Sequence, residues 1–393
     1  MTADDVEELV RRLLAEHVDD FETEFLGAQF DAGLARVDYP LDHGGLDADP
    51  ALQDVIDTAL DRVGRRYPWL RNPMGIGMCG PTIAARGTEE QKARFLRPIF
   101  TAEELWCQLF SEPGAGSDVA GLGTGAVRHG DQWVVNGQKI WTSLAHLAKW
   151  GLLLARTDPE RPKHKGLTTF IIDMRQSGVE VRPIRSMAGA SGFNEVFLTD
   201  AVVPDAMRVG EVGEGWRVAN ATLMNERVSI GSEVGPRGSG PIADVIAAWR
   251  VSAEQCPVRR DEVTRLWIDA ELVRLGSLRA QAKRERGIPG PEGSVLKLLS
   301  GQVGQRCAEL VVDLLGPRGG LLRGPYPTNV RDDGQAEAER LQDPVLVFIG
   351  SPGTTIAGGT NNIQKNILGE RVLGLPREPG VDPNTPWSQI PRS

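Results

Sequence analysis

The sequence predicts an α+β protein in three parts: an N-terminal all-helical domain over residues 1–104, a middle antiparallel β domain over 105–206, and a C-terminal four-helix bundle over 207–393. Three observations predict this order. Apolar residues follow the helical period early in the chain, short β-rich runs fill the middle, and long helical patterns return after Pro204. A chain of 393 residues is long enough for two or three packed units.

The first part shows helical periodicity and a helix start signal. Its first helix carries one apolar face, formed by Val6, Leu9, Val10, Leu13 and Leu14. Further on, Thr88 and Gln91 follow Gly87 with the spacing of a capping box, in which two side chains satisfy backbone groups at a helix start. Both features predict packed helices up to about residue 104.

The middle part contains the runs QWVV, KIWTS, GLLLA, TTFIIDM, VEVRPI and EVFLTDAVV. These runs are rich in β-branched and aromatic residues, so they predict strands. Asn136 and Gly137 stand between WVV and QKIW, and Asn-Gly between two apolar runs is a strong signal for a two-residue hairpin turn. We therefore expect the chain to reverse at these two residues.

The last part shows helical periodicity in four segments, near residues 214–250, 258–286, 293–315 and 362–374. Four helices of this kind suit a bundle. The motif GIGMCG, residues 75–80, matches the glycine pattern of a dinucleotide-binding loop. It follows a Pro-bearing stretch that cannot be a buried parallel strand, so we interpret its small residues as a helix crossing.

Composition excludes several classes of protein. The net charge is −9 and the pI about 5.3, with no long Lys/Arg run, so the sequence lacks the electrostatic pattern of a nucleic-acid-binding protein. Acidic residues occupy the N-terminus, where a signal peptide needs a basic start, and 18 apolar residues never occur in a row. We expect a cytoplasmic protein with no membrane span.

Cysteine and histidine patterns argue against a metal site. The 4 cysteines are widely scattered and form no CxxC pair, and the 5 histidines form no HxxxH or HExxH. A GxSxG or GxxxxGK[ST] motif is also absent from the sequence, which removes support for a serine hydrolase or a P-loop protein. We expect neither a bound metal nor a disulfide framework, as suits a reducing cytosol.

The segment LWCQLFSEPGAGSD, residues 105–118, places Ser111 and Glu112 before a turn of small residues. Backbone N–H groups and hydroxyls are exposed there with little side-chain bulk, so the segment can lie against a ring or a phosphate. Taken alone, it reads equally well as a tight β turn. Together with NGQKIWTS and GGTNNIQ, in this order and spacing, it resembles the acyl-CoA dehydrogenase family over nearly the whole chain.

Members of this family hold FAD between the β domain and the bundle, and remove the α and β hydrogens of an acyl-CoA thioester as a proton and a hydride. The resemblance implies that Ser111 and Ser143 contact the flavin near N5 and O4, and that the Trp141 indole lies beside the ring. It places Ser117 beside the thioester and pantetheine arm. The full set of cofactor-binding residues that it implies is Leu109, Ser111, Gly116, Ser117, Trp141, Ser143, Thr360 and Asn362.

The closing motif TTIAGGTNNIQKN, residues 354–366, leads two glycines into the start of a helix. By the resemblance, Thr360 and Asn362 meet the pyrophosphate or ribityl region of FAD. N–H groups at a helix start and the helix dipole favour an anion, so we expect phosphates to be accepted there without a cation.

The reaction needs a base, and much of the family carries a Glu immediately before the Gly-Thr pair of this motif. Here that position is Gly358, preceded by Ala357. Ala219, Leu223, Glu226 and Ile230 share one helical stripe, so the Glu226 carboxylate is expected to be buried. A Glu on such a stripe can also be a structural ion-pair partner.

The isovaleryl and long-chain branches of the family place their base in an ER pair on this same helix. The resemblance therefore implies that Glu226 is the base and that Arg227 supports it or the CoA. The small residues Ala357 and Gly358 widen the cleft beside the flavin, which favours a bulky, branched or steroid side-chain acyl group. The substrate-binding residues that follow are Ser117, Arg227, Ala357 and Gly358.

Two departures from the family pattern concern assembly. The homotetrameric members carry Arg-x-x-Phe-Gly and Gln-x-x-Gly-Gly segments that reach a neighbour's FAD, whereas this chain reads AEQCPVRRDEVTRLW and DLLGPRGG. Some bacterial members are heterotetramers of two unlike dehydrogenase-like chains, and this chain resembles the base-bearing kind. Assembly as a homo-oligomer is the alternative to a heterotetramer. The expected electron acceptor is an electron-transfer flavoprotein. Alternatives are an acyl-CoA oxidase and a non-catalytic subunit of a heteromeric enzyme.

Overall fold

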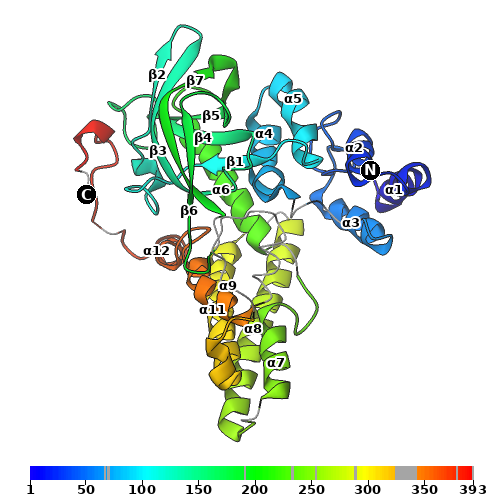
Figure 1. Cartoon of the computed structure of the whole chain (residues 1–393). Helices are drawn as coiled ribbons and strands as arrows, with labels where there is room; N and C mark the ends of the chain where they lie inside the picture. Colours follow the sequence, from blue (N-terminus) through cyan, green and yellow to red (C-terminus); the bar gives the residue numbers. More distant parts are fainter. Residues whose placement is uncertain are drawn as a thin grey trace. The chain divides into compact units, whose positions relative to one another are not determined.

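The computed structural model describes the chain except for residues 66–67, 69–70, 190–191, 232–233, 253–254, 287–289, 324–342, 378 and 392–393, and for the side chains of 225–231 and 284–285. The chain forms two compact units. The first contains Met1–Arg182, Phe193–Asn225 and Val381–Ser393, and the second contains Pro183–Gly192 and Glu226–Gly380. Figure 1 labels their helices and strands.

The first unit begins with helices, namely α1 (Ala3–His17), α2 (Glu22–Asp31), α3 (Gln53–Arg62), α4 (Gly80–Arg86) and α5 (Glu89–Phe100). Helix α1 buries Val6, Val10 and Leu13, which confirms its predicted apolar face. The predicted capping box of Thr88 and Gln91 is present at the start of α5. The GIGMCG motif is helical, because a π-helical turn over Gly75–Cys79 continues directly into α4.

The same unit contains one eight-stranded sheet. Its strands are β1 (Trp106–Leu109), β2 (Gly125–His129), β3 (Gln132–Ser143), β4 (Trp150–Arg156), β5 (Leu167–Asp173), β6 (Val179–Ile184), β7 (Phe193–Pro204) and β8 (Arg208–Val209). The order is β6-β7-β3-β2-β4-β5-β8, and β1 pairs with β4. The pairs β2–β3, β3–β7, β4–β5 and β5–β8 are antiparallel, whereas β1 and the first residue of β2 run parallel to β4. The predicted α+β class is confirmed.

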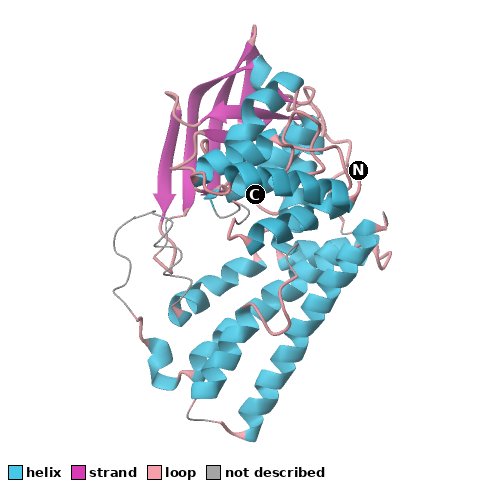
Figure 2. Ribbon diagram, turned by 90° about the vertical axis from the view of Figure 1, so that its right-hand side faces the viewer, coloured by secondary structure: helices cyan, strands magenta, loops and turns pink. Residues whose placement is uncertain are grey.

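Strand β4 is buried on both faces because a hydrophobic core lies on each side of it. Leu152 and Leu154 belong to a core shared with α2, α4 and α5, whereas Leu153 and Ala155 belong to a core formed by the sheet itself. Successive side chains of a strand point to opposite faces, so a strand covered on both sides requires a continuous apolar run. Figure 2 shows helices of this unit over one face of the sheet.

The hairpin predicted at Asn136 and Gly137 is wrong, because β3 runs through both residues. The turn lies earlier, at Gly130 and Asp131, between β2 and β3, and Gly130 has a φ of 64°. At Asn136 and Gly137 the pairing of β3 with β7 shifts register instead. The Asn136 side chain bonds to Asp200, so here Asn-Gly marks a strand irregularity rather than a reversal.

The helices after the sheet are α6 (Gly215–Gly231), α7 (Pro241–Val251), α8 (Pro257–Glu285), α9 (Glu292–Leu314), α11 (Pro344–Gly350) and α12 (Asn361–Arg371). The predicted helical segment over 214–250 is therefore two helices. Pro236 and Pro241 lack the N–H that a continuing helix needs, and Gly238 and Gly240 have φ values of 78° and 74°.

Helices α7, α8 and α9 enclose the core of the second unit. Its buried residues are Ile242, Val245, Ala248, Val263, Leu266, Val303, Cys307, Leu310, Val311 and Leu314. Among the described residues, no helix is apolar over enough of its length to cross a membrane.

Candidate active site

The Ser111–Asp118 loop follows β1 and is built from small residues. Glu112 and Ala115 bond to each other through both backbone groups, at N···O distances of 3.1 and 3.0 Å, which closes a tight turn. Gly114 and Gly116 are exposed, and no heavy atom lies within 4 Å of the place where a Cβ would stand on either. The turn therefore presents bare backbone with free space above it.

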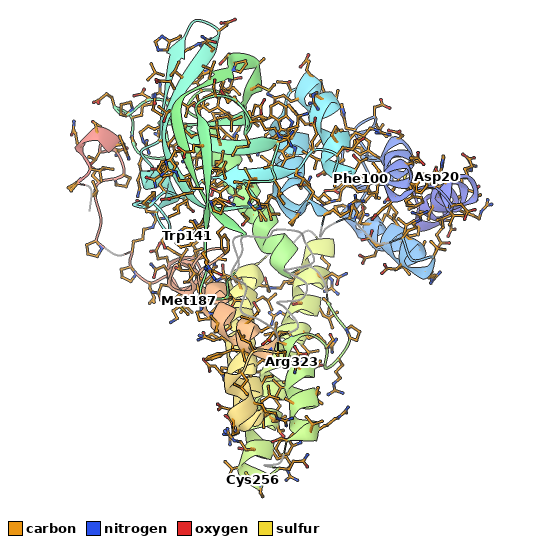
Figure 3. All side chains as sticks on the ribbon, in the orientation of Figure 1. Asp20, Phe100, Trp141, Met187, Cys256 and Arg323 are labelled. Atoms are coloured by element: carbon orange, nitrogen blue, oxygen red, sulfur yellow. The ribbon has the colours of Figure 1, made fainter. Side chains whose placement is uncertain are left out.

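Trp141 lies at an irregularity in β3, where pairing with β7 shifts between Lys139 and Thr142. Its backbone has a φ of 60°, a left-handed conformation that is strained for a residue with a side chain. The indole is 58% exposed and lies edge to face with Phe193, at 6.1 Å between ring centroids. Figure 3 labels Trp141 at the end of its strand. Backbone strain and an exposed aromatic ring together are typical of a ligand-binding position.

The structure brings the Ser111 loop and the Trp141 segment together. The Ile140 amide donates to the Ser111 carbonyl at 2.9 Å. Directly before Ile140, the buried Lys139 ammonium donates to the Phe110 carbonyl at 3.1 Å and to Glu112 at 2.8 Å. Two motifs that are about 30 residues apart in sequence therefore form one surface.

The Glu112 carboxylate connects the Ser111 loop to Lys139 and to the backbone of residues 123 and 124. Its carboxylate accepts from the amides of Gly123 and Thr124 at 2.7 and 2.9 Å, in addition to Lys139. Burial by itself raises the pKa of Glu112, but the Lys139 charge and these hydrogen bonds outweigh burial and hold the pKa below its ordinary value. Sequence reasoning missed Glu112 and Lys139 as a pair, although both stand inside the motifs LWCQLFSEPGAGSD and NGQKIWTS, where the other charged residue is Asp118.

The remaining predicted residues of the first unit differ in exposure. Gly116 and Ser117 are exposed, and Ser143 is half-buried. Leu109 is completely buried in the core of the sheet.

In the second unit, the closing motif forms the start of α12 as predicted. The Thr360 hydroxyl accepts from the Ile363 amide at 3.2 Å and caps the helix. Gly358 and Gly359 have φ values of 67° and 85°, which a residue with a Cβ adopts only under strain. A residue with a carboxylate side chain at position 358 would therefore be strained in this backbone, which is a structural reason for the glycine. Ala357 and Asn362 are exposed.

A cation does lie at this helix start, contrary to the expectation from sequence. Lys297 of α9 is buried, and its ammonium lies 3.4 Å from the side-chain oxygen of Asn361, the first residue of α12. It was missed because Lys297 is 64 residues away in sequence and stands in an apolar helix segment. Helix N–H groups and an ammonium together favour an anion more strongly than the helix start alone.

The predicted base and its neighbour are only partly described. The backbones of Glu226 and Arg227 lie in α6, as predicted, but their side chains lie outside the described residues. On the same stripe, Ala219 is completely buried and Leu223 packs against the core of the first unit.

A cavity of about 590 Å³ lies inside the second unit, between α8, α9 and the segment that leads into α7. Most of its exposed lining is apolar, contributed by Ile242, Trp267, Val273, Leu296 and Val303 among others. The charged groups in the wall are Lys297 and the ion pair of Glu271 with Arg274, at 2.7 Å, and three serines add hydroxyls. A largely apolar cavity of this size with a few polar groups has the properties of a small-molecule site.

The described residues fit FAD on two grounds. Gly114 and Gly116 leave free space at the Ser111–Asp118 loop, and the Trp141 indole is exposed, as contact with a flat ring requires. In addition, the side-chain oxygens of Thr142 and Gln364 are buried without a hydrogen-bond partner among the described residues, one next to Trp141 and one in the first turn of α12. Buried polar atoms without partners are uncommon unless a ligand or water completes them.

Family models cover almost the whole chain. The acyl-CoA dehydrogenase N-terminal domain matches residues 1–103, the middle domain matches 107–201, and the C-terminal domain matches 213–373. The boundaries predicted from sequence at 104 and 206 stay a prediction.

Similar proteins agree with these matches. The chain is 40% identical over 352 residues to the acyl-CoA dehydrogenase FadE34 of Mycobacterium tuberculosis, covering 88% of this chain but only 45% of that protein. It is 39% identical to the acyl-CoA dehydrogenase IpdE1 of the same organism, covering 88% of this chain and 86% of that protein.

Solved structures extend the similarity to the fold. A variant of the Tcur3481-Tcur3483 steroid ACAD has a TM-score of 0.72 and 26% identity, over 96% of this chain and 100% of that one. The ChsE4-ChsE5 complex from Mycobacterium tuberculosis has a TM-score of 0.69 and 27% identity, over 95% of this chain and 97% of that one. By its three family domains and its relatives, this chain belongs to the acyl-CoA dehydrogenase family, whose members are flavoprotein oxidoreductases acting on acyl-CoA thioesters.

Proposed function

We propose that this chain is an FAD-dependent dehydrogenase that forms a double bond between the α and β carbons of an acyl-CoA with a bulky, branched or ring-bearing acyl group. The observation that supports a large acyl group is the cavity of about 590 Å³ inside the second unit, whose lining is separate from Ser117, Ala357 and Gly358. Its volume lies within the range of roughly 300–1,000 Å³ found for small-molecule pockets. The name of one similar structure, a steroid ACAD, agrees with a large acyl group.

Glu226 is the proposed base. Its carboxylate takes the proton from the α carbon, and the electron pair of that C–H bond becomes the new double bond as the β hydrogen leaves with its own electron pair. FAD, when bound, accepts that hydrogen as a hydride. Glu226 shares a helical stripe with Ala219 and Leu223, which pack in the core of the first unit, and a carboxylate can serve as the general base for a C–H proton.

Other residues of the chain bind and orient. The hydroxyls of Ser111 and Ser143 are proposed to hydrogen-bond the flavin ring, and Trp141 to cover it, while Ser117 lies beside the thioester. Thr360, Asn362 and the start of α12 are proposed to hold phosphate oxygens of FAD. Lys297 adds a positive charge at that helix start.

Partners form part of the proposal. Heteromeric acyl-CoA dehydrogenases are among the similar structures, and another similar structure is named as an electron-transferring flavoprotein. We propose assembly as a homo-oligomer or with a second dehydrogenase-like chain, with an electron-transfer flavoprotein as acceptor. The visible spectrum and native mass of the chain, purified alone and with a second such chain, decide between the two assemblies.

The test of the function is Glu226→Gln, with Glu214→Gln, directly before the start of α6, as the control. We expect Glu226→Gln to retain FAD and to lose turnover by about 10²–10⁴-fold, whereas Glu214→Gln keeps both. A Glu226→Gln protein with a near-normal rate contradicts the assignment of the base. A wild-type chain with FAD but no activity toward any acyl-CoA favours a non-catalytic subunit, and oxygen consumption without an electron-transfer flavoprotein favours an oxidase.

A further inference from the structure

The C-terminal segment, defined as residues 381–391, packs against the first unit. The Trp387 amide donates to the Arg161 carbonyl and the Ser388 amide to the Pro159 carbonyl, both at 2.9 Å. Trp387 is only 8% exposed, although it lies close to the end of the described chain. The segment also lies beyond residue 373, where the match to the family model ends.

Three consecutive backbone carbonyls of the 120–124 segment accept hydrogen bonds from the side chains of Trp387 and Arg156. The Trp387 indole N–H donates to the Gly121 carbonyl at 3.1 Å. Arg156 donates to the carbonyls on either side, those of Ala120 at 2.7 Å and Leu122 at 3.1 Å. The Arg156 guanidinium also stacks over the Trp387 ring at 4.2 Å, so the two side chains hold each other in place.

The next two residues of the same segment are bonded by Glu112. The amides of Gly123 and Thr124 donate to the Glu112 carboxylate, and the Trp387 ring lies 3.8 Å from the place where a Cβ of Gly123 would stand. Glu112 in turn pairs with Lys139. Every step from Trp387 to the Ser111 loop is therefore a direct contact between described residues.

We propose that Trp387 is a positioning residue of the active site. By fixing the 120–124 segment, it orients Glu112, and the Glu112–Lys139 pair sets the Ser111 loop against the Trp141 segment. The choice of FAD as the ligand of that surface rests on the proposed function. The contacts themselves do not depend on it, because all of them lie within the first unit.

The test uses the full chain with Trp387→Ala and Trp387→Phe. Hydrogen exchange of the Gly123 and Thr124 amides is measured without FAD, and the FAD Kd is measured by titration with flavin fluorescence. For Trp387→Ala we expect faster exchange of both amides and a higher FAD Kd, each by about tenfold. Trp387→Phe keeps a ring over Gly123 but loses the bond to Gly121, so its values should fall between those of the wild type and Trp387→Ala.

Trp249→Ala is the matched control, because Trp249 packs against the core of the second unit. It should lower the unfolding midpoint without a selective change at Gly123 and Thr124. Unchanged exchange at these amides in Trp387→Ala overturns the proposal, and so does faster exchange with an unchanged FAD Kd. A wild-type chain that binds no FAD contradicts the proposed function. Hydrogen exchange of the Gly123 and Thr124 amides then tests the link from Trp387 to Glu112 by itself.

Discussion

Lys139 Nζ lies 2.8 Å from a carboxylate oxygen of Glu112, and the Lys139 side chain is completely shielded from solvent. The pair joins the Ser111 loop to the strand that carries Trp141 and Ser143. The same buried ion pair therefore holds both the Ser111 loop and the Trp141 segment, so the position of one segment depends on the other. Removing one member of such a buried ion pair is costly, because the charge that remains is shielded from water and has lost its partner.

The first prediction tests this pair. Lys139→Met should lower the free energy of unfolding by about 3–5 kcal/mol, because it leaves the Glu112 charge buried without its partner. The double variant Lys139→Met, Glu112→Gln removes both charges and should recover much of the loss. Urea unfolding of the two single variants and the double variant measures this. A double variant whose loss equals the sum of the single losses would show that the two residues act independently.

The second prediction concerns acid stability and Glu104. This carboxylate accepts from Arg94 at 2.9 and 3.0 Å, from Lys149 at 2.6 Å and from the Trp150 indole at 2.9 Å. Burial by itself raises the pKa of Glu104, but these hydrogen bonds outweigh burial and lower the pKa from 4.5 to about 2.

Since the folded-state pKa of Glu104 is the lower one, its stabilisation is complete above about pH 4.5 and is lost as the pH falls toward 2. Glu104→Gln should lose about 2–3 kcal/mol at pH 7, and the gap to the wild type should close in acid. Thermal melting of both proteins between pH 7 and pH 2.5 is the measurement. A gap that stays constant over this range contradicts the prediction.

The third prediction separates strain from binding at Trp141. Trp141→Gly removes a mostly exposed side chain and relieves a left-handed backbone that costs about 1 kcal/mol for a residue with a Cβ. Stability should therefore be unchanged or slightly higher, whereas the FAD Kd should rise by about tenfold or more, since the ring surface is lost. Thermal melting and FAD titration measure the two effects. A clear loss of stability would mean that the indole is structural.

The fourth prediction tests the cavity as the acyl site. Gly304 of α9 lines the cavity, and no heavy atom lies within 4 Å of the place where its Cβ would stand. Gly304→Leu should fill the space and gain about 1 kcal/mol of helix propensity, so the protein should fold well. kcat/KM for a ring-bearing acyl-CoA should fall by about tenfold or more, with a short linear acyl-CoA little affected.

Gln302→Leu is the control for Gly304→Leu, because Gln302 lies on the same helix but is exposed. Its kcat/KM should match the wild type for both substrates. Equal losses for the short and the ring-bearing substrate in Gly304→Leu would remove the cavity from the acyl site.

Local sequence signals were reliable where the interaction is local. The capping box of Thr88 and Gln91 and the helix start at Thr360 involve residues three apart, so spacing alone predicts them. Asn136 and Gly137 show the limit, because the same dipeptide suits a turn or an irregular strand, and pairing with β7 decides which one forms. The helical segment near 214–250 was misjudged because its periodicity outweighed Pro236 and Pro241.

The sequence by itself determined the order of helical and β parts, the motifs, and the resemblance that places Glu226, Ser111 and Trp141 in one kind of chemistry. Only the tertiary structure decided which charges support those motifs. Lys139 reaches Glu112, Lys297 reaches Asn361, and Trp387 reaches Gly121, across 27, 64 and 266 residues. Such contacts depend on how strands and helices pack rather than on any repeat along the chain, so sequence spacing carries no signal for them.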